Sequence, residues 1–147
     1  MNGKTCFFIG SRHAPSRTQP QLAEAVDKHI IEYGVTSFTV GHYGSFDSLA
    51  TGVLREAKKQ YSHIKLYLLA PYALNQNREA PEGFDGTFYP EGLEKVPMRY
   101  AIVQANRYMV QNSNYLISYP GVGNSRKIVE YAQGREKMGL IKVTILI

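Results

Sequence analysis

The sequence predicts an α/β fold, with helices on both faces of a mainly parallel sheet of five strands. Short apolar runs alternate along most of the chain with longer segments of helical periodicity, and this alternation is typical of right-handed β–α–β crossovers. The strand-like runs are continuously apolar, as expected when both faces of a sheet are covered. These features indicate a Rossmann-like, three-layer domain but leave the strand order open.

The individual elements follow from periodicity and from punctuating residues. Each expected strand is a dense apolar run that stops at a glycine, a proline or a polar turn. In the first expected helix, Leu22, Val26 and Ile30 share one face, and Pro20 suits the first turn. The expected strands are 5–9, 37–40, 64–69, 115–119 and 141–147, and the expected helices are 21–33, 46–61, 98–111 and 125–138.

The stretch 71–97 interrupts this rhythm and is expected to be irregular, because it holds four prolines and three glycines. Loops of that length inside a compact domain are commonly lids or binding loops. The stretch follows the third strand, so it would start at the carboxyl edge of the sheet, where Tyr72, Phe84, Phe88 and Tyr89 could cover a base. A loop packed on the domain or on a second subunit is the alternative.

Composition limits the class of protein. A chain of 147 residues that is 44% hydrophobic suits one domain, and a domain of this size buries roughly 68–70% of its unfolded surface. No apolar run reaches the ~18 residues of a membrane span, and no signal peptide is expected. The single cysteine, Cys6, excludes an internal disulfide and a cysteine-based zinc site. We expect one cytoplasmic domain over 1–147, without a membrane segment, metal or cofactor.

Polar residues and glycines concentrate after three of the expected strands. In open parallel sheets, ligands bind outside the carboxyl ends of the strands. Glycines let the backbone approach a ligand, helix starts attract phosphate, and the guanidinium of Arg12 could clamp the same anion. Turn glycines and ordinary helix caps are the alternative interpretation. The candidate ligand-binding residues are Gly10, Ser11, Arg12, Gly41, Gly44, Ser45, Asp47, Arg107, Pro120, Gly121, Gly123, Asn124 and Ser125.

Four stretches resemble one superfamily: 8–12 (FIGSR), 40–50 (VGHYGSFDSLA), 106–110 (NRYMV) and 112–119 (NSNYLISY). They are similar to the SLOG superfamily, and more narrowly to its YpsA-like (DUF1273) branch of small bacterial and phage-associated proteins. The likeness covers almost the whole chain, in the same motif order. The superfamily includes the LOG phosphoribohydrolases and the DNA-processing protein DprA. The resemblance implies a Rossmann-like fold and a pocket for nucleotides or nucleotide-derived ligands, without implying one reaction.

The sequence departs from the LOG motif P-G-G-x-G-T-x-x-E, in which the glutamate serves the glycosidic bond. Laid without gaps from Pro120, Gly121 and Ser125 match, but Ile128 occupies the position of the glutamate. Glu130 lies two residues further on, so it points to a different side of the helix. Cleavage of an N-glycosidic bond needs a carboxylate near the anomeric carbon. We therefore expect no LOG-type activity.

Asp47 is the remaining carboxylate in a matched motif and is the candidate catalytic residue, although a helix cap or a ribose contact is the preferred interpretation. Asp85 and Glu82, in the stretch 71–97, would be the alternative carboxylates. His13 and His42 are possible acid–base groups.

Three functions are compatible with these residues. The leading interpretation is a binding module for a nucleotide or an ADP-ribose-like ligand, acting as a sensor or sequestering protein, with a homo-oligomer left open. The first alternative is a hydrolase or transferase acting on a nucleotide ribosyl bond. The second is single-stranded nucleic-acid binding, which the net charge of +5 would suit, although the basic residues are dispersed rather than gathered along a groove.

Overall fold

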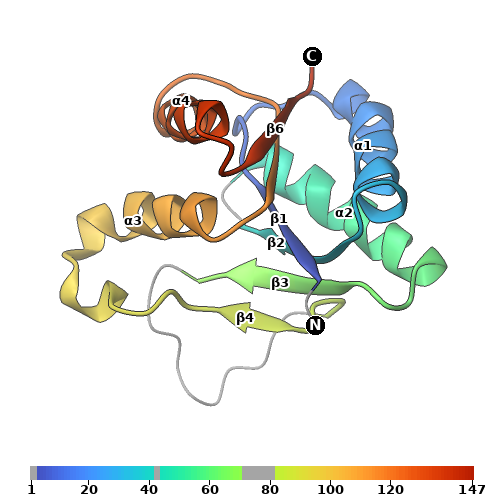
Figure 1. The fold of residues 1–147 in the computed structure, drawn as a ribbon, viewed down its shortest axis with the longest axis horizontal. Helices are drawn as coiled ribbons and strands as arrows, with labels where there is room; N and C mark the ends of the chain where they lie inside the picture. The colour runs from blue at the N-terminus through green and yellow to red at the C-terminus, as the bar shows by residue number, and fades with distance from the viewer. Residues whose placement is uncertain (1–2, 42–43, 71–81) are drawn as a thin grey trace.

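The computed structural model describes residues 3–41, 44–70 and 82–147, which form a parallel sheet of six strands between two layers of helices (Figure 1). The strand order is β4-β3-β2-β1-β5-β6, and every neighbouring pair is parallel. Short 3₁₀ turns, Ser16–Thr18 and Leu93–Lys95, precede α1 and α3. The strands are β1 (Lys4–Phe8), β2 (Val35–Val40), β3 (Lys65–Leu69), β4 (Gly86–Phe88), β5 (Tyr115–Ser118) and β6 (Lys142–Ile145), and the helices are α1 (Gln19–Ile31), α2 (Ser45–Gln60), α3 (Met98–Gln111) and α4 (Asn124–Lys137).

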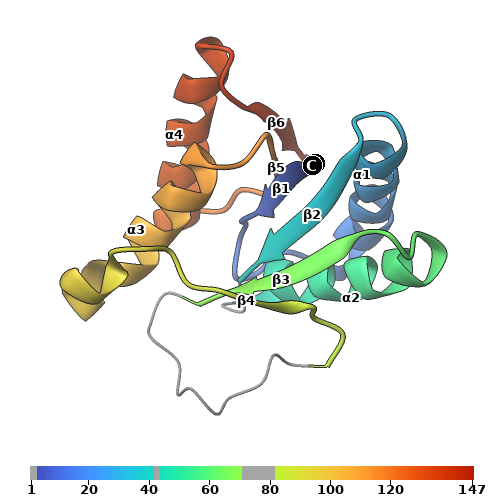
Figure 2. The same cartoon turned by 60° about the horizontal axis from the view of Figure 1, so that its bottom comes forward.

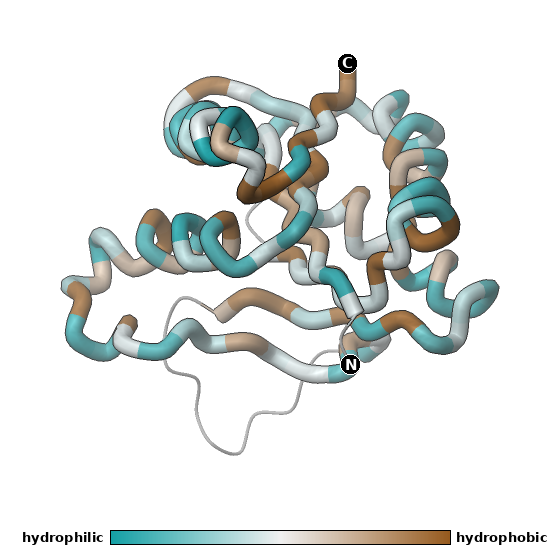
Figure 3. Tube along the Cα trace, in the orientation of Figure 1, coloured by the Kyte–Doolittle hydropathy of each residue, from teal (hydrophilic) through white to brown (hydrophobic). Residues whose placement is uncertain are grey.

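The helices cover the sheet in pairs, α1 and α2 on one face and α3 and α4 on the other (Figure 2). Each face has its own core, and the two adjacent phenylalanines of β1 serve opposite faces because successive side chains of a strand alternate. Phe8 packs with Phe38 and Phe46 on the first face, whereas Phe7 packs with Met109 on the second. The hydrophobic residues accordingly gather along the central strands and the inner sides of the helices (Figure 3). The Rossmann-like fold class is confirmed.

The expected number of strands is corrected from five to six, since part of the stretch 71–97 is a strand rather than irregular chain. β4 pairs with β3, and the N–H of Ala70 donates to the carbonyl of Phe88 at 2.8 Å. A strand of three residues that begins with glycine, between prolines, carries too little periodicity to predict. Residues 71–81, with Tyr72, lie outside the described residues.

The described part of that stretch packs on the body of the protein. Phe84 packs against the first core, and Phe88 and Tyr89 pack against the second. Arg55 of α2 donates to the carbonyl of Glu82 at 2.7 Å, which fixes the turn before β4 on that helix. These contacts agree with the alternative of a loop packed on the domain.

The strand order places a change of direction beside β1. From β1 the chain moves outward through β2 and β3 to β4, and α3 then carries it back to β5, on the other side of β1. The connection after β1 therefore leads toward β2, whereas the connection after β5 leads the opposite way, toward β6. Because these two connections diverge, a crevice forms between them at the carboxyl ends of β1 and β5.

Candidate functional site

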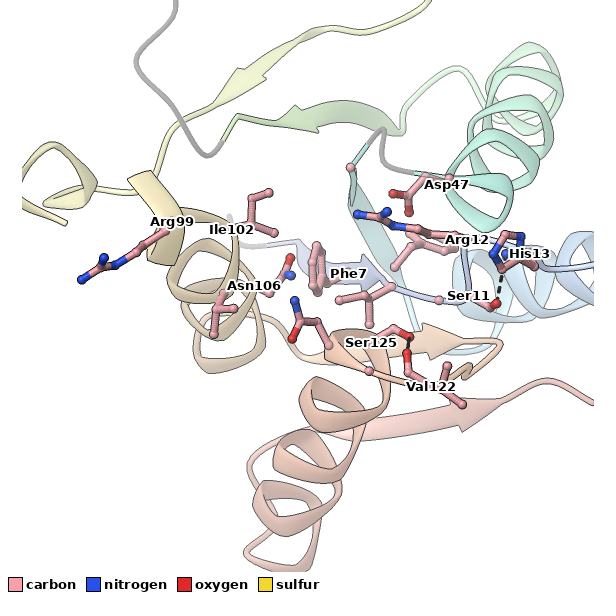
Figure 4. Close-up of a pocket in the computed structure, with 18 residues that line it drawn as sticks. Phe7, Ser11, Arg12, His13, Asp47, Arg99, Ile102, Asn106, Val122 and Ser125 are labelled. Atoms are coloured by element: carbon pink, nitrogen blue, oxygen red, sulfur yellow. Dashed lines mark hydrogen bonds between the residues drawn. The ribbon is translucent and has the colours of Figure 1, made fainter. Parts of the chain in front are cut away.

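A pocket of about 400 Å³ lies at this crevice, within the range typical of small-molecule sites (Figure 4). It is enclosed by the junctions after β1, β2 and β5 and by one side of α3. The predicted ligand-binding residues that line it are Gly10, Ser11, Arg12, Gly41, Gly44, Asp47, Gly123, Asn124 and Ser125. Three further predicted residues, Ser45, Pro120 and Gly121, belong to the same junctions but are not among its lining residues.

The start of α2 is held by the turn after β1. The N–H of Ser45 donates to the carbonyl of Arg12 at 3.0 Å, and the N–H of Phe46 donates to the carbonyl of Ser11 at 3.2 Å. Gly44 permits this approach, because a Cβ there would lie 2.6 Å from the Cα of Arg12. The hydroxyl of Ser45 donates to the carbonyl of Ala14 at 2.6 Å. These amides and this hydroxyl therefore bind the protein itself and are not offered to a phosphate.

Two other candidate glycines also serve contacts within the protein. A Cβ on Gly10 would lie 2.5 Å from Cγ of Phe46, and a Cβ on Gly121 would lie 2.8 Å from both Cβ and Oγ of Ser11. Real Cβ atoms essentially never come so close to another heavy atom. Both positions need glycine to let the three junctions pack together, with or without a ligand.

The start of α4 differs from that of α2, because its amides remain open. Gly123 precedes the helix with φ +75°, a conformation that favours glycine. Because glycine has no side chain, it cannot cap the amides of the first turn. The first helical bond is donated by Lys127 to the carbonyl of Gly123. Within the described part of the chain, no acceptor meets the N–H groups of Asn124, Ser125 and Arg126. Open amides at a helix start carry partial positive charge and attract anions.

Charged side chains stand on the α2 side of the pocket. Figure 4 shows Arg12 and Asp47 extending from neighbouring junctions on that side, with His13 beside them. Arg99 of α3 lies at the rim, and its guanidinium stacks 4.9 Å from the ring centre of Tyr100 and points away from the pocket. A cation and an open helix start thus face one cavity, and both of these features attract anions.

Apart from Asn106 and the rim residue Arg99, the α3 side of the pocket is apolar. Phe7, Ile102 and Val103 line this side. Asn106 is 8% exposed, its side chain bonds to none of the described residues, and it points into the pocket (Figure 4). Asn106 was not among the predicted site residues, although it is in phase with Ile102 and Met109 on the buried face of its helix.

The structure places Arg107, the residue predicted from the same motif, outside this pocket. One residue along a helix turns the side chain by ~100°, which directs Arg107 to another side of α3. Its guanidinium lies 5.6 Å from the ring centre of Tyr131, beside a separate cavity of about 160 Å³.

The other candidate carboxylates are engaged elsewhere. Asp85 accepts a hydrogen bond from the N–H of Leu66 at 2.8 Å and pairs with Lys58, at the start of β3. Burial acts to raise the pKa of Asp85, but the hydrogen bonds from Lys58 and Leu66 outweigh it and hold the pKa below the ordinary value. Glu130 lies 3.9 Å from Arg126 on the surface of α4. Asp47 is thus the one carboxylate among the described lining residues.

Ile128, in the position of the LOG glutamate, is 3% exposed and packs in the core beneath α3 and α4. Its side chain does not face the pocket, so this position could not present a carboxylate to a ligand without rotation of the helix. Cys6 is also buried, and burial raises the pKa of its thiol.

The described residues, 3–41, 44–70 and 82–147, hold neither a metal-binding cluster nor a membrane-spanning helix. No three side chains of His, Cys, Asp or Glu lie together in a way that could hold a metal ion. No helix in these ranges combines the length and hydropathy needed to cross a membrane.

Comparison with known proteins shows the fold. No family model and no curated protein sequence matches the chain. Among solved structures, the chain is similar to DNA processing protein A (DprA) from Helicobacter pylori, which was described for its mode of binding single-stranded DNA. The TM-score is 0.55 at 12% sequence identity, and the alignment covers 95% of this chain and 74% of that chain. The two proteins therefore share the Rossmann-like architecture over nearly the whole of this chain.

Proposed function

We propose that the pocket beside β1 binds a nucleotide or nucleotide-derived ligand through its phosphate, and that the protein acts as a sensor or sequestering module. The observation that carries this proposal is the open start of α4, which faces the cavity together with Arg12. Hydrogen bonds that involve a charged group contribute about 1.5–3 kcal/mol each, more than neutral ones do. A phosphate bound there would satisfy the amides of Asn124 and Ser125, which have no acceptor among the described residues.

We also propose that the protein belongs to the SLOG superfamily, in its YpsA-like branch. The fold shared with DprA supports membership of the SLOG superfamily. The narrower placement in the YpsA-like branch, as one domain over 1–147, is supported by the order of the four matched sequence stretches.

Calorimetric titration with adenosine monophosphate and ADP-ribose tests the phosphate site. Arg12→Ala should weaken binding by about 1.5–3 kcal/mol, which is roughly 10- to 150-fold in the dissociation constant. Arg107→Ala is the matched control: it removes the same charge from a residue outside the pocket, and it should leave affinity unchanged. Equal affinity of the wild type and the Arg12 variant would overturn the proposal, and a loss only in the Arg107 variant would move the site to the smaller cavity.

Single-stranded DNA is the second candidate ligand, favoured by the shared fold with DprA and by the net charge of +5. A labelled oligothymidylate, titrated by fluorescence anisotropy over a series of salt concentrations, distinguishes the two. A DNA-binding protein should lose affinity steeply with salt and gain it with oligonucleotide length. Binding of the oligonucleotide that adenosine monophosphate fails to displace would favour the nucleic acid.

Hydrolysis of the ligand is tested with the same preparations. A binding module returns the nucleotide intact, whereas a ribosyl hydrolase releases free base that chromatography detects. Turnover that vanishes in Asp47→Asn would assign an enzymatic role to this carboxylate, because Asp47 is the one acidic side chain among the described lining residues.

A further inference from the structure

We propose that the α3 side of the pocket is a base-recognition subsite in which Asn106 selects a purine carrying an exocyclic amine, of the adenine type. This inference rests on the proposed function, since it assumes that a nucleotide phosphate occupies the start of α4. It adds the identity of the base and the residue that reads it.

Asn106 is the most unusual buried polar group in the pocket wall. The residue is 8% exposed, and no hydrogen bond joins its amide to another residue in the ranges 3–41, 44–70 and 82–147. Its amide oxygen and nitrogen are not among the fully enclosed polar atoms that lack a partner, so they open onto the pocket. The polar atoms of buried side chains usually bond to other protein groups or to water. An amide that opens onto a cavity and has no partner among the described residues is available to bind a ligand there.

The surroundings of Asn106 suit a flat, largely apolar group. Phe7 and Ile102 lie beside it in Figure 4, and Val103 completes this wall. Arg12 and Asp47 stand on the opposite side of the same cavity, and the guanidinium of Arg99, at the α3 rim, points away from it. The pocket is therefore polar at one end and apolar at the other, as a nucleotide is polar at its phosphate and flat and weakly polar at its base.

The chemistry of an asparagine amide limits which base it can read. The amide offers an acceptor oxygen and a donor nitrogen side by side, so it pairs with a donor and an acceptor that are also adjacent. The amine of adenine and the neighbouring ring nitrogen present this pattern, and asparagine is a common bidentate partner of adenine. Removing the amine would leave the amide oxygen of Asn106 buried without a donor, so the site should reject a purine that lacks it.

Two ligands that differ by one group test this reading: adenosine monophosphate, and purine riboside 5′-monophosphate, which lacks the exocyclic amine. The wild type should bind the first at least about tenfold more tightly by calorimetry. Asn106→Leu, similar in size, should bind the two ligands within about twofold of each other, because the group that distinguishes them is gone. Gln104→Leu is the matched control, since Gln104 is an exposed amide of the same helix outside this pocket, and it should keep the preference.

Thermal unfolding without ligand gives a second readout that a purely structural role would not produce. Asn106→Leu should unfold at the same temperature as the wild type or higher, because the substitution breaks no hydrogen bond among the described residues and adds apolar surface to an apolar wall. A markedly lower unfolding temperature would mean that Asn106 supports the fold, and would overturn the proposal.

Binding of this series of ligands distinguishes failure of the base-recognition subsite from failure of the phosphate site. If the wild type binds both monophosphates equally and Arg12→Ala weakens both, the base-recognition subsite is refuted while the phosphate site stands. If guanosine monophosphate is preferred and that preference depends on Asn106, the adenine assignment is wrong. If no nucleotide binds, the phosphate site fails and the subsite fails with it.

Discussion

Substitution of Gly10 by alanine should destabilise the fold through one contact. A Cβ at this position would lie 2.5 Å from Cγ, 2.6 Å from Cδ2 and 2.9 Å from Cβ of Phe46. Carbon atoms in proteins settle at about 3.5–4.0 Å, so one of the two residues must move by roughly 1 Å. Phe46 is fully buried, and its N–H is bonded to the carbonyl of Ser11, so it has little freedom to shift.

Overpacking of this kind costs about 1–3 kcal/mol in a well-packed core. For a protein of about 150 residues, each kcal/mol lowers the unfolding temperature by roughly 2–4 °C, so Gly10→Ala should lower it by about 2–12 °C. Differential scanning calorimetry measures this directly. Gly52→Ala is the control of opposite sign: Gly52 lies inside α2 with nothing within 4 Å of an added Cβ, and alanine there should stabilise by about 0.5–1 kcal/mol.

A double-mutant cycle identifies the contact that is responsible. Phe46→Leu removes the ring that the new methyl group meets, so the combined variant should be more stable than the sum of the two single losses by about 1 kcal/mol or more. If Gly10→Ala unfolds at the wild-type temperature, or the two losses simply add, the packing explanation of Gly10 is wrong.

Three further outcomes are expected from residues outside the pocket. Asp85→Asn should lower the free energy of unfolding by about 1 kcal/mol, measured by urea denaturation at pH 7; the effect is smaller than for a buried ion pair because Asp85 and Lys58 are partly exposed. The difference between variant and wild type should shrink as the pH falls through the lowered pKa of Asp85, because the wild-type carboxylate is then protonated. Ile128→Glu should destabilise strongly and give no release of free base from adenosine monophosphate, since it places a carboxylate in the core; turnover would contradict the geometry. His29 is buried and donates to the carbonyl of Ala25, and burial lowers the pKa of its imidazole. Because the unfolded chain takes up a proton at His29 below about pH 6.5 and the folded protein does not, the wild type should lose at most about 1.4 kcal/mol of stability per pH unit below that pH. His29→Gln should lose less over the same range.

Most of the fold follows from local patterns. Long helices such as α2 repeat their buried positions many times, so their existence is predictable. The ends of α2 lie one residue from those expected, the ends of α1 lie two residues away, and α3 has the expected ends. β4 could not be predicted, because its three residues are defined by pairing with β3 and not by any periodicity of their own.

The location of the pocket was predictable, but the contribution of single residues was not. The rule that ligands lie at the carboxyl ends of parallel strands identified the three junctions. Gly10 and Gly44 instead owe their identity to Phe46 and Arg12, which are more than thirty residues distant along the chain. Asn106 was not predicted because its neighbour Arg107 carries the charge expected of a phosphate-binding residue. Which of the two faces the pocket depends on how α3 is rotated about its axis, and the sequence alone does not show this.

The hydrogen bonds from the start of α2 to the turn after β1 have a consequence for motion. Because Arg12 offers its side chain to the pocket and its carbonyl to Ser45, a ligand that immobilises Arg12 also holds the first turn of α2 in place. The amide protons of Ser45 and Phe46 should then exchange with solvent deuterium more slowly when the pocket is filled, whereas those at the far end of α2 should exchange at an unchanged rate. A bound ligand would thus reduce the mobility of the first turn of α2 without changing its conformation.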